Sequence, residues 1–354
     1  MDTTSAAKPL IYIDVPDLDF NERIGRTEVN KALNDAALFG KNDVITAALA
    51  AGADPNHQDS DGMTALHSVA YGDDADVVRL LIDHGANPNL RNNLGETPLH
   101  IAARSWSEDC TKALLEGGAD PSIVDERGAT SLIGARTVEN VDLLLSAGAD
   151  PNHQNEWGCT ALHTVADRGD ADVLRLLIDH GANPNLQDNL GETPLHIAAR
   201  SPYEEGTKAL LEGGADPGIV DERGATPLIG AHTAENVDLL LDYGADINAR
   251  DRHGDTALHL QAQNQRSPAL TATLQKLYDH GVIQVQPSQS SEPTALDRLI
   301  DRGADRSVTN NTGKTPLDYL PKGFSSPAIE RIALREAVED VALEEQPRRQ
   351  RARL

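Results

Sequence analysis

The sequence is poor in aromatic residues, in cysteine and in positive charge, and each shortage excludes a class of protein. Aromatic residues make up only 3% of the 354 positions. A compact enzyme core uses more large rings, so closely stacked helices are favoured. The two cysteines, Cys110 and Cys159, are too few for a disulfide framework. With 56 acidic against 31 basic residues the net charge is −25, which excludes a surface for nucleic acid or anionic lipid.

Long apolar segments are missing as well. No run reaches the roughly 18 apolar residues that a membrane helix requires. The N-terminus, MDTTSAAKPLIYIDV, lacks the basic start and long apolar stretch of a signal peptide. We therefore predict a monomeric protein of the cytoplasm, in a reducing compartment, that binds neither membrane nor nucleic acid. Its acidic surface suits a basic protein partner.

Two short motifs recur along the chain in one register. A Gly-Ala pair follows an apolar stretch, and its first seven occurrences are spaced by 33, 33, 30, 33, 33 and 30 residues. A Thr-x-Leu motif repeats with the same spacings. The period indicates units that bury their apolar faces against their neighbours. The pairs begin at Gly52, Gly85, Gly118, Gly148, Gly181, Gly214, Gly244 and Gly303, and the Thr-x-Leu motifs at Thr64, Thr97, Thr130, Thr160, Thr193, Thr226 and Thr256.

A longer period is superimposed on the first. Residues 64–158 match residues 160–254 at an offset of 96, as if three repeats had been duplicated as a block. The third repeat of each block, beginning at Thr130 or Thr226, is three residues short. We assign the missing residues to the loop between its helices.

Each unit is predicted to run turn, helix, loop, helix. Thr97 suits a helix N-cap, because its hydroxyl can accept from a free backbone N–H. Pro98 then takes the first helical position, where its missing N–H costs nothing. Leu99 and Ala102 are three apart and share a face. Gly85 ends a second helix, because glycine readily takes the left-handed conformation.

These motifs resemble those of the ankyrin-repeat family. Residues 188–199, DNLGETPLHIAA, and 210–216, LLEGGAD, are similar to the family pattern almost throughout. The resemblance covers roughly residues 31–320. It implies an all-α fold, a curved solenoid of about nine helix-loop-helix repeats with short β-hairpin fingers.

The departures from the pattern suggest the domain organisation. We predict an acidic N-terminal extension (1–28), an N-terminal capping repeat (29–62), six ankyrin repeats (63–255), divergent repeats with an insertion or truncation (256–320), a C-terminal capping helix (321–346) and a basic disordered tail (347–354).

The divergent region allows two interpretations. From Thr256 to the next Gly-Ala pair the distance is 47 residues, 26 more than the usual 21. One interpretation is a single repeat with an insertion near 266–291. The other is a complete repeat ending at Gly281, followed by a truncated one. Apolar residues that resemble a second ankyrin helix favour the complete repeat slightly: Leu274, Leu277 and Tyr278.

The twelve histidines do not form a catalytic or metal-binding pattern. Five of them occupy the same motif position, which the resemblance implies is structural and supports the hairpin: His67, His100, His163, His196 and His259. The carboxylates fall in repeated turns such as that of Asp125, and we find no nucleophile elbow, Walker motif or kinase motif. We predict no enzyme, no cofactor and no metal.

The family uses hairpin tips and inner helices to bind proteins, so the variable residues at these positions are the candidates for partner contact. Trp and Arg are common among binding hot spots, which favours Trp157. The tip candidates are Ser60, Asp61, Asn93, Leu94, Glu126, Arg127, Glu156, Trp157, Asn189, Leu190, Glu222, Arg223, Arg252 and His253, and the inner-helix candidates are Tyr71, Arg104, Arg200 and Tyr203.

The function predicted from these residues is that of a scaffold or adaptor that binds a protein partner. Two alternatives stay open. The net charge also suits an acidic inhibitor, of the antitoxin or immunity type, that blocks a basic partner. The Glu344-Glu345 pair before the arginine-rich end faintly resembles some type IV secretion tails, which would suit a bacterial effector secreted into a host cell.

Overall fold

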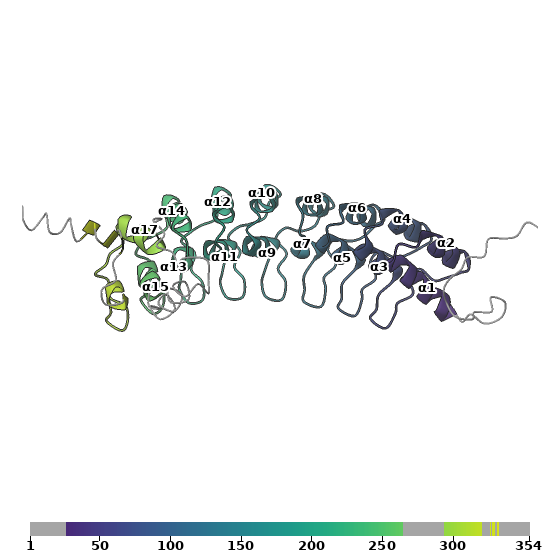
Figure 1. Ribbon diagram of the computed structural model, residues 1–354, viewed down its shortest axis with the longest axis horizontal. Helices are drawn as coiled ribbons and strands as arrows, with labels where there is room; N and C mark the ends of the chain where they lie inside the picture. Colours follow the sequence, from purple (N-terminus) through teal and green to yellow (C-terminus); the bar gives the residue numbers. More distant parts are fainter. Residues whose placement is uncertain (1–25, 265–293, 321–325, 327, 330, 333–354) are drawn as a thin grey trace, which may run out of the picture. The chain divides into compact units, whose positions relative to one another are not determined.

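The chain is built from pairs of short helices (Figure 1). The computed structural model describes residues 26–264, 294–320, 326, 328, 329, 331 and 332. The chain divides into two compact units, 1–161 with 179–182 and 162–178 with 183–354. The first unit contains α1 (Arg26–Leu38) with α2 (Asn42–Ala50), α3 (Ala65–Gly72) with α4 (Ala75–Asp83), α5 (Pro98–Arg104) with α6 (Glu108–Glu116), and α7 (Ser131–Gly134) with α8 (Val138–Ser146).

The second unit repeats this arrangement. It contains α9 (Ala161–Arg168) with α10 (Ala171–Asp179), α11 (Pro194–Arg200) with α12 (Glu204–Glu212), α13 (Pro227–Gly230) with α14 (Ala234–Asp242), α15 (Ala257–Asn264), α17 (Ala295–Asp301) and the 3-10 helix η1 (Pro316–Tyr319). We call the first helix of each pair inner and the second outer. Inner helices pack on inner helices and outer on outer, as α3 does on α5 and α4 on α6.

The helix boundaries have local causes that the sequence predicts. Thr97 is extended at the N-cap of α5, and Pro98 follows at the first helical position. At the end of α4, the N–H of Ala86 donates to the carbonyl of Leu81 at 3.0 Å. Gly85 makes this closure possible with a φ of +90°, a left-handed conformation that favours glycine.

The core of each unit lies between its helix layers. It consists of leucines from both layers with alanines that let the helices approach closely. Equivalent positions in successive pairs supply the fully buried side chains of Leu66, Leu99, Leu162 and Leu195 from inner helices, and of Leu81, Leu114, Leu177 and Leu210 from outer helices.

The fingers that join the pairs are tight turns, and none of the described residues lies in a strand. The expected β-hairpins are reduced to single pairings of backbone groups. Val124 and Thr130 form one isolated antiparallel bridge. In the preceding finger, the N–H of Asn92 donates to the carbonyl of Glu96 at 2.8 Å.

The third pair of each block is shortened in its inner helix, and the expectation that the loop is shortened is wrong. Helix α7 has four residues, whereas α5 has seven. An asparagine from the following outer helix fills the space of the missing turn. Asn140 donates from Nδ2 to the carbonyls of Ala103 and Ser105, at 3.2 and 3.1 Å, at the end of α5. Asn236 does the same in the second unit.

Helix α17 takes the place of an outer helix for α15. It packs against both α15 and α14, as α14 packs against α13 and α12. The contact between a motif histidine and the next finger is also made here, but across a larger separation in sequence. His259 reaches the carbonyl of Lys314, 55 residues away, where other units show 29, and the difference is the 26 extra residues. These contacts favour one repeat with an insertion, and the preference for a complete repeat ending at Gly281 stays an untested prediction. The apolar residues behind that preference, 274–278, lie outside the described residues.

The ends of the array differ in part from the expected boundaries. Helix α1 begins at Arg26, so the first repeat includes residues that we assigned to the extension. Near the C-terminus, residues 328, 329, 331 and 332 are helical, and Arg331 pairs with Asp301 of α17 at 2.5 Å. The remainder of the capping helix, the extension and the basic tail lie outside the described residues. The described residues hold eight helix pairs, so about nine repeats stays a prediction.

Candidate protein-binding surface

Each finger is built around an asparagine or aspartate. The Oδ1 atom of Asn92 accepts from the N–H groups of Leu94 and Glu96, both at 2.9 Å. Gly95 completes the turn with a φ of +75°, and a Cβ there would lie 2.6 Å from the backbone nitrogen of Glu126. The same double contact is made by Asp59, Asp125, Asn155, Asp188, Asp221, Asp251 and Asn310.

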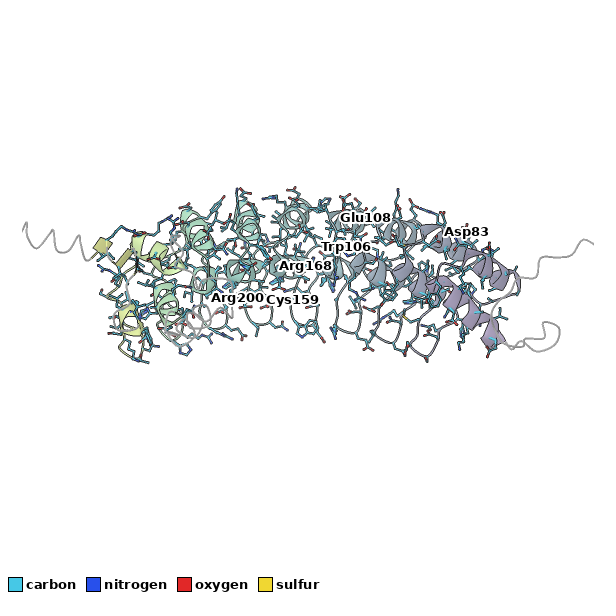
Figure 2. All side chains as sticks on the ribbon, in the orientation of Figure 1. Asp83, Trp106, Glu108, Cys159, Arg168 and Arg200 are labelled. Carbon is cyan, nitrogen blue, oxygen red and sulfur yellow. The ribbon has the colours of Figure 1, made fainter. Side chains whose placement is uncertain are left out.

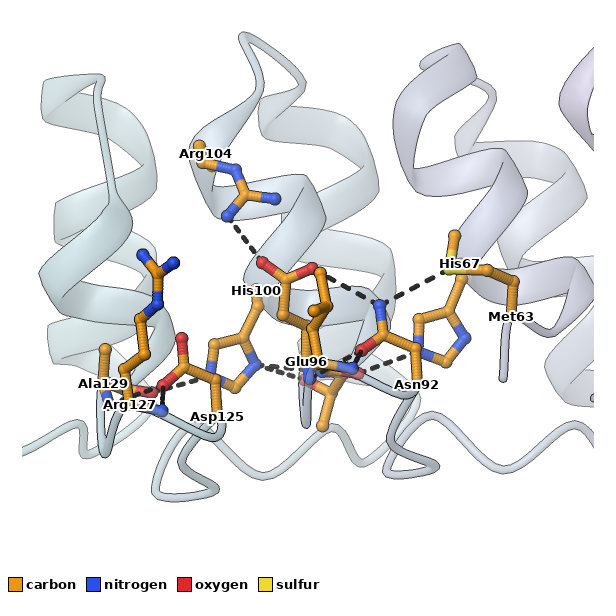
Figure 3. A network of polar contacts seen from close by, with 11 residues as sticks. Met63, His67, Asn92, Glu96, His100, Arg104, Asp125, Arg127 and Ala129 are labelled. Carbon is orange, nitrogen blue, oxygen red and sulfur yellow. Dashed lines mark hydrogen bonds and ion pairs between the residues drawn. The ribbon is translucent and has the colours of Figure 1, made fainter. Parts of the chain in front are cut away.

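In five repeats a buried histidine ties one finger to the next, whereas the two short repeats have Ile133 and Ile229 at this position. The Nδ1 atom of His100 accepts from the N–H of Thr97 at 3.1 Å, and its Nε2 lies 3.0 Å from the carbonyl oxygen of Ala129 (Figure 3). A backbone N–H can only donate, so the ring proton is on Nε2. The predicted structural role is confirmed. Equivalent contacts join His67 to Glu96, His163 to Glu192, His196 to Ala225 and His259 to Lys314.

Burial keeps four of these rings neutral. Loss of solvent lowers the pKa of His67, His100, His163 and His196, and the bond to a backbone carbonyl offsets this only in part. A protonated ring could no longer accept from the threonine N–H. These histidines therefore hold the fingers in place and are unsuited to acid–base chemistry at neutral pH.

Backbone bonds also join neighbouring finger tips directly. The N–H of Asn93 donates to the carbonyl of Asp61 at 2.9 Å, so the tips of two successive fingers move together. Within each unit the pattern recurs at 2.9–3.0 Å, from Glu126 to Leu94, Glu156 to Arg127, Glu222 to Leu190, Arg252 to Arg223 and Asn311 to His253. The tips of each unit therefore form a row held by the backbone, whatever their side chains are.

All fourteen predicted tip residues are exposed. Three apolar side chains stand out, since Leu94 is 63% exposed, Leu190 59% and Trp157 48%. The guanidinium of Arg127 lies 5.7 Å from the centre of the Trp157 ring, over its face. Exposed aromatic and apolar groups on a rigid row are suited to contact with a protein. Their contact with a partner stays a prediction.

The two inner-helix arginines are already paired within the chain. The Nη1 atom of Arg104 lies 2.6 Å from Oε1 of Glu96 (Figure 3). Arg200 pairs with Glu192 in the same way. These bonds raise the pKa of both arginines. Burial raises the pKa of Glu96, but Arg104 outweighs this and the net pKa is lowered. Each ion pair links a finger to the end of its inner helix. The two arginines are therefore poorer candidates for contact with a partner protein than the sequence suggested.

The sequence located one tyrosine candidate correctly and the other wrongly. Tyr71 lies in the last turn of inner helix α3 and is exposed. Tyr203 is the N-cap of outer helix α12, because α11 already ends at Arg200. Three exposed aromatic residues were missed. Tyr243 follows outer helix α14, and two lie where inner helices end, Phe39 after α1 and Trp106 after α5 (Figure 2 labels Trp106). The only feature of the sequence that could have pointed to the last two is an aromatic residue at the position where an inner helix ends.

No arrangement for catalysis or metal binding is found in the described part of the chain. No group of three or more His, Cys, Asp or Glu side chains there could hold a metal ion. Burial raises the pKa of the Cys110 thiol, which makes it a poor nucleophile. Among the described helices, none is long and apolar enough to cross a membrane.

Comparison with known proteins agrees with this geometry. A family model, "Ankyrin repeats (3 copies)", matches residues 33–125, 131–221 and 202–286. The chain belongs to the ankyrin-repeat family. Among solved structures, it is similar to the ankyrin repeat domain of Bcl-3, described as a unique member of the IkappaB protein family. The identity is 28% and the TM-score 0.52, over 59% of this chain and 97% of that domain. Ankyrin repeats are generally modules for protein–protein interaction.

Proposed function

We propose that this protein is a non-catalytic adaptor that holds a partner protein on the finger-tip rows of its units and the neighbouring inner-helix residues. The observation that carries this proposal is the row within each unit, in which backbone bonds hold exposed Leu94 and Trp157 in the first unit and exposed Leu190 in the second. A preorganised surface loses little conformational freedom on binding. Catalysis would require a constellation of reactive groups, and the tip residues offer none.

The test is a pull-down from the source lysate with the intact protein and with a triple variant, Leu94→Ala, Trp157→Ala and Leu190→Ala. A matched control replaces three exposed apolar residues away from the tips, Val138→Ala, Tyr243→Ala and Leu317→Ala. We expect a partner that the tip variant loses and the control retains at moderate salt. A partner retained equally by both folded variants would contradict the proposal.

The acidic surface motivates a second candidate, an inhibitor that covers a basic partner. The supporting observation is the net charge of −25. Association driven by charge weakens steeply as salt rises. A basic partner retained by the tip variant but lost at moderate salt would favour this candidate over the adaptor. Cytoplasmic location, a monomeric state and secretion into a host cell stay predictions.

A further inference from the structure

The first unit carries exposed aromatic rings at the ends of three successive inner helices. Phe39 is 69% exposed, Tyr71 56% and Trp106 77%. They account for three of the eleven aromatic residues in the chain. We call Phe39, Tyr71 and Trp106 the aromatic edge. Aromatic residues are enriched in protein interfaces, and rings on three neighbouring repeats are suited to one continuous ligand.

Contacts between the loops place these three helix ends side by side. A Cβ on Gly72, next to Tyr71, would lie 3.6 Å from the carbonyl oxygen of Leu38, next to Phe39. On the other side, the hydroxyl of Ser107 donates to the carboxylate of Asp73. Glu96 chiefly raises the pKa of Arg104, and the phenol of Tyr71 adds to it, so Tyr71 also lies beside the end of α5.

Carboxylates surround two of the three rings. Asp73 is exposed beyond Tyr71, and Glu108 and Asp109 are exposed in the first turn of α6, directly after Trp106 (Figure 2). Arg104, two residues before Trp106, is paired with Glu96. Beside Phe39, the exposed Lys41 and Asp43 offset each other in charge. The aromatic edge is therefore flanked by net negative charge.

Rings flanked by carboxylates are suited to arginine or lysine side chains. A guanidinium can lie flat on an aromatic face while its N–H groups pair with a carboxylate. Packed helices lie about 8–10 Å apart, so the rings recur at about that interval. An extended polyproline-type chain rises about 3.1 Å per residue and presents the same side every third residue, about 9.3 Å on. The two periods match.

We propose that the aromatic edge binds an extended segment of a partner protein in which a basic side chain recurs at every third residue. Successive basic groups cover Phe39, Tyr71 and Trp106. The inference rests on the proposed function only through Tyr71, which both surfaces share. The second block lacks the edge, because Asp167 and Pro202 replace Tyr71 and Trp106. Of the two duplicated blocks, only the first therefore contributes to such a site.

The test measures binding of two labelled peptides to the full chain by fluorescence anisotropy at moderate salt. One peptide has arginine at every third position in a proline background, and the other has the same composition with its arginines adjacent. We expect the spaced peptide to bind at least about five-fold more tightly. Trp106→Ala should weaken its binding about five-fold, and Trp106→Ala with Tyr71→Ala more than tenfold.

The control variant, Trp157→Ala, removes an exposed ring outside the edge and should leave binding of the spaced peptide unchanged. Thermal unfolding of each variant verifies that it is folded. Equal binding of both peptides, or binding insensitive to Trp106 and Tyr71, would overturn the inference and leave only general attraction between opposite charges. The finger-tip variant should still bind the spaced peptide, so failure of the adaptor proposal is distinguishable from failure of this one.

Discussion

The two duplicated blocks, 64–158 and 160–254, differ mainly where side chains are exposed. Their buried histidines and most of their buried leucines are the same, although Leu174 stands where the first block has Val78. Their first two finger tips, Asn-Leu and Glu-Arg, are identical. The third tip differs, with Glu156 and Trp157 against Arg252 and His253. The inner-helix ends differ too, with Tyr71 against Asp167. After duplication the packing residues were kept while the solvent-facing ones changed, as expected for a frame that carries two different surfaces.

The largest effect on stability is expected from equivalent substitutions in the cores of the two blocks. Leu99→Ala and Leu195→Ala each remove a fully buried side chain from equivalent inner helices. Each should lower the free energy of unfolding by about 2–5 kcal/mol, because a cavity is left. Urea unfolding followed by circular dichroism measures both, with Leu94→Ala at an exposed tip as the control. Costs that differ between blocks by more than about 1 kcal/mol would show that their cores are not equivalent.

A smaller effect is expected from the finger histidines. His100→Ile and His196→Ile remove the contacts to Thr and Ala backbone groups but keep an apolar side chain, as Ile133 and Ile229 do naturally in the short repeats. Each substitution should lower the free energy of unfolding by about 1–3 kcal/mol, because buried backbone groups lose their hydrogen-bond partners. His253→Ile, at an exposed tip, is the control. If the free energy of unfolding falls no more than in the His253→Ile control, the histidine contacts do not stabilise the fingers.

One exposed difference between the blocks is a correlated pair. In the first block Asp73, at a φ of +60°, accepts from Ser107, whereas in the second Gly169, at +73°, lies under the ring of Tyr203. A Cβ on Gly169 would lie 2.8 Å from that ring. Gly169→Asp should therefore cost about 1–2 kcal/mol.

Adding Tyr203→Ser to Gly169→Asp recreates the pair of the first block and should recover part of this cost. Denaturant unfolding of the single and double variants forms a double-mutant cycle. Strictly additive costs would show that the two positions changed independently.

The smallest effect is expected from pH. Just below neutral pH, the free energy of unfolding should fall slightly because of histidines in both blocks. The pKa of His67, His100, His163 and His196 is lowered in the folded chain, so the unfolded chain binds more protons. Their contribution is complete above pH 6.5, the unfolded value, and is lost as pH falls through the folded values. Glu96 and Glu192, whose pKa is lowered from 4.5, act only in more acid solution.

Urea unfolding between pH 7.5 and 5.5 measures this loss, and the His100→Ile, His196→Ile double variant should show a smaller slope. A stability that is flat across this range, or equal slopes in both proteins, would contradict the assignment of neutral finger histidines. The sign follows because protonation is favoured only after the buried rings are exposed.

Helices, caps and core could be predicted because their causes are local. A threonine before Pro98 or a glycine at position 85 acts within a few residues, and the leucine spacing repeats in every unit. The exposed tips followed from the family resemblance.

What could not be predicted depends on contacts distant in sequence. Residues 274–278 resemble an outer helix in sequence, whereas the position of α17 beside α15 depends on its contacts with α14 and α15, which lie far from it in the chain. The pairing of Arg104, a predicted contact residue, with Glu96 could not be foreseen, because only folding brings the finger that carries Glu96 beside the end of α5. Trp106 was missed because a single ring at a loop has no periodic pattern to mark it.

The offset of 26 residues in the contact from His259 to Lys314 has a consequence for the architecture. Helix α15 ends at Asn264 and α17 begins at Ala295, yet the finger, the histidine contact and the tip bond that follow α17 match those of the other repeats. Helix pairing here is therefore indifferent to the length of chain between the two helices. We therefore expect that a foreign domain could be inserted between α15 and α17 without disturbing the packing of the repeats on either side.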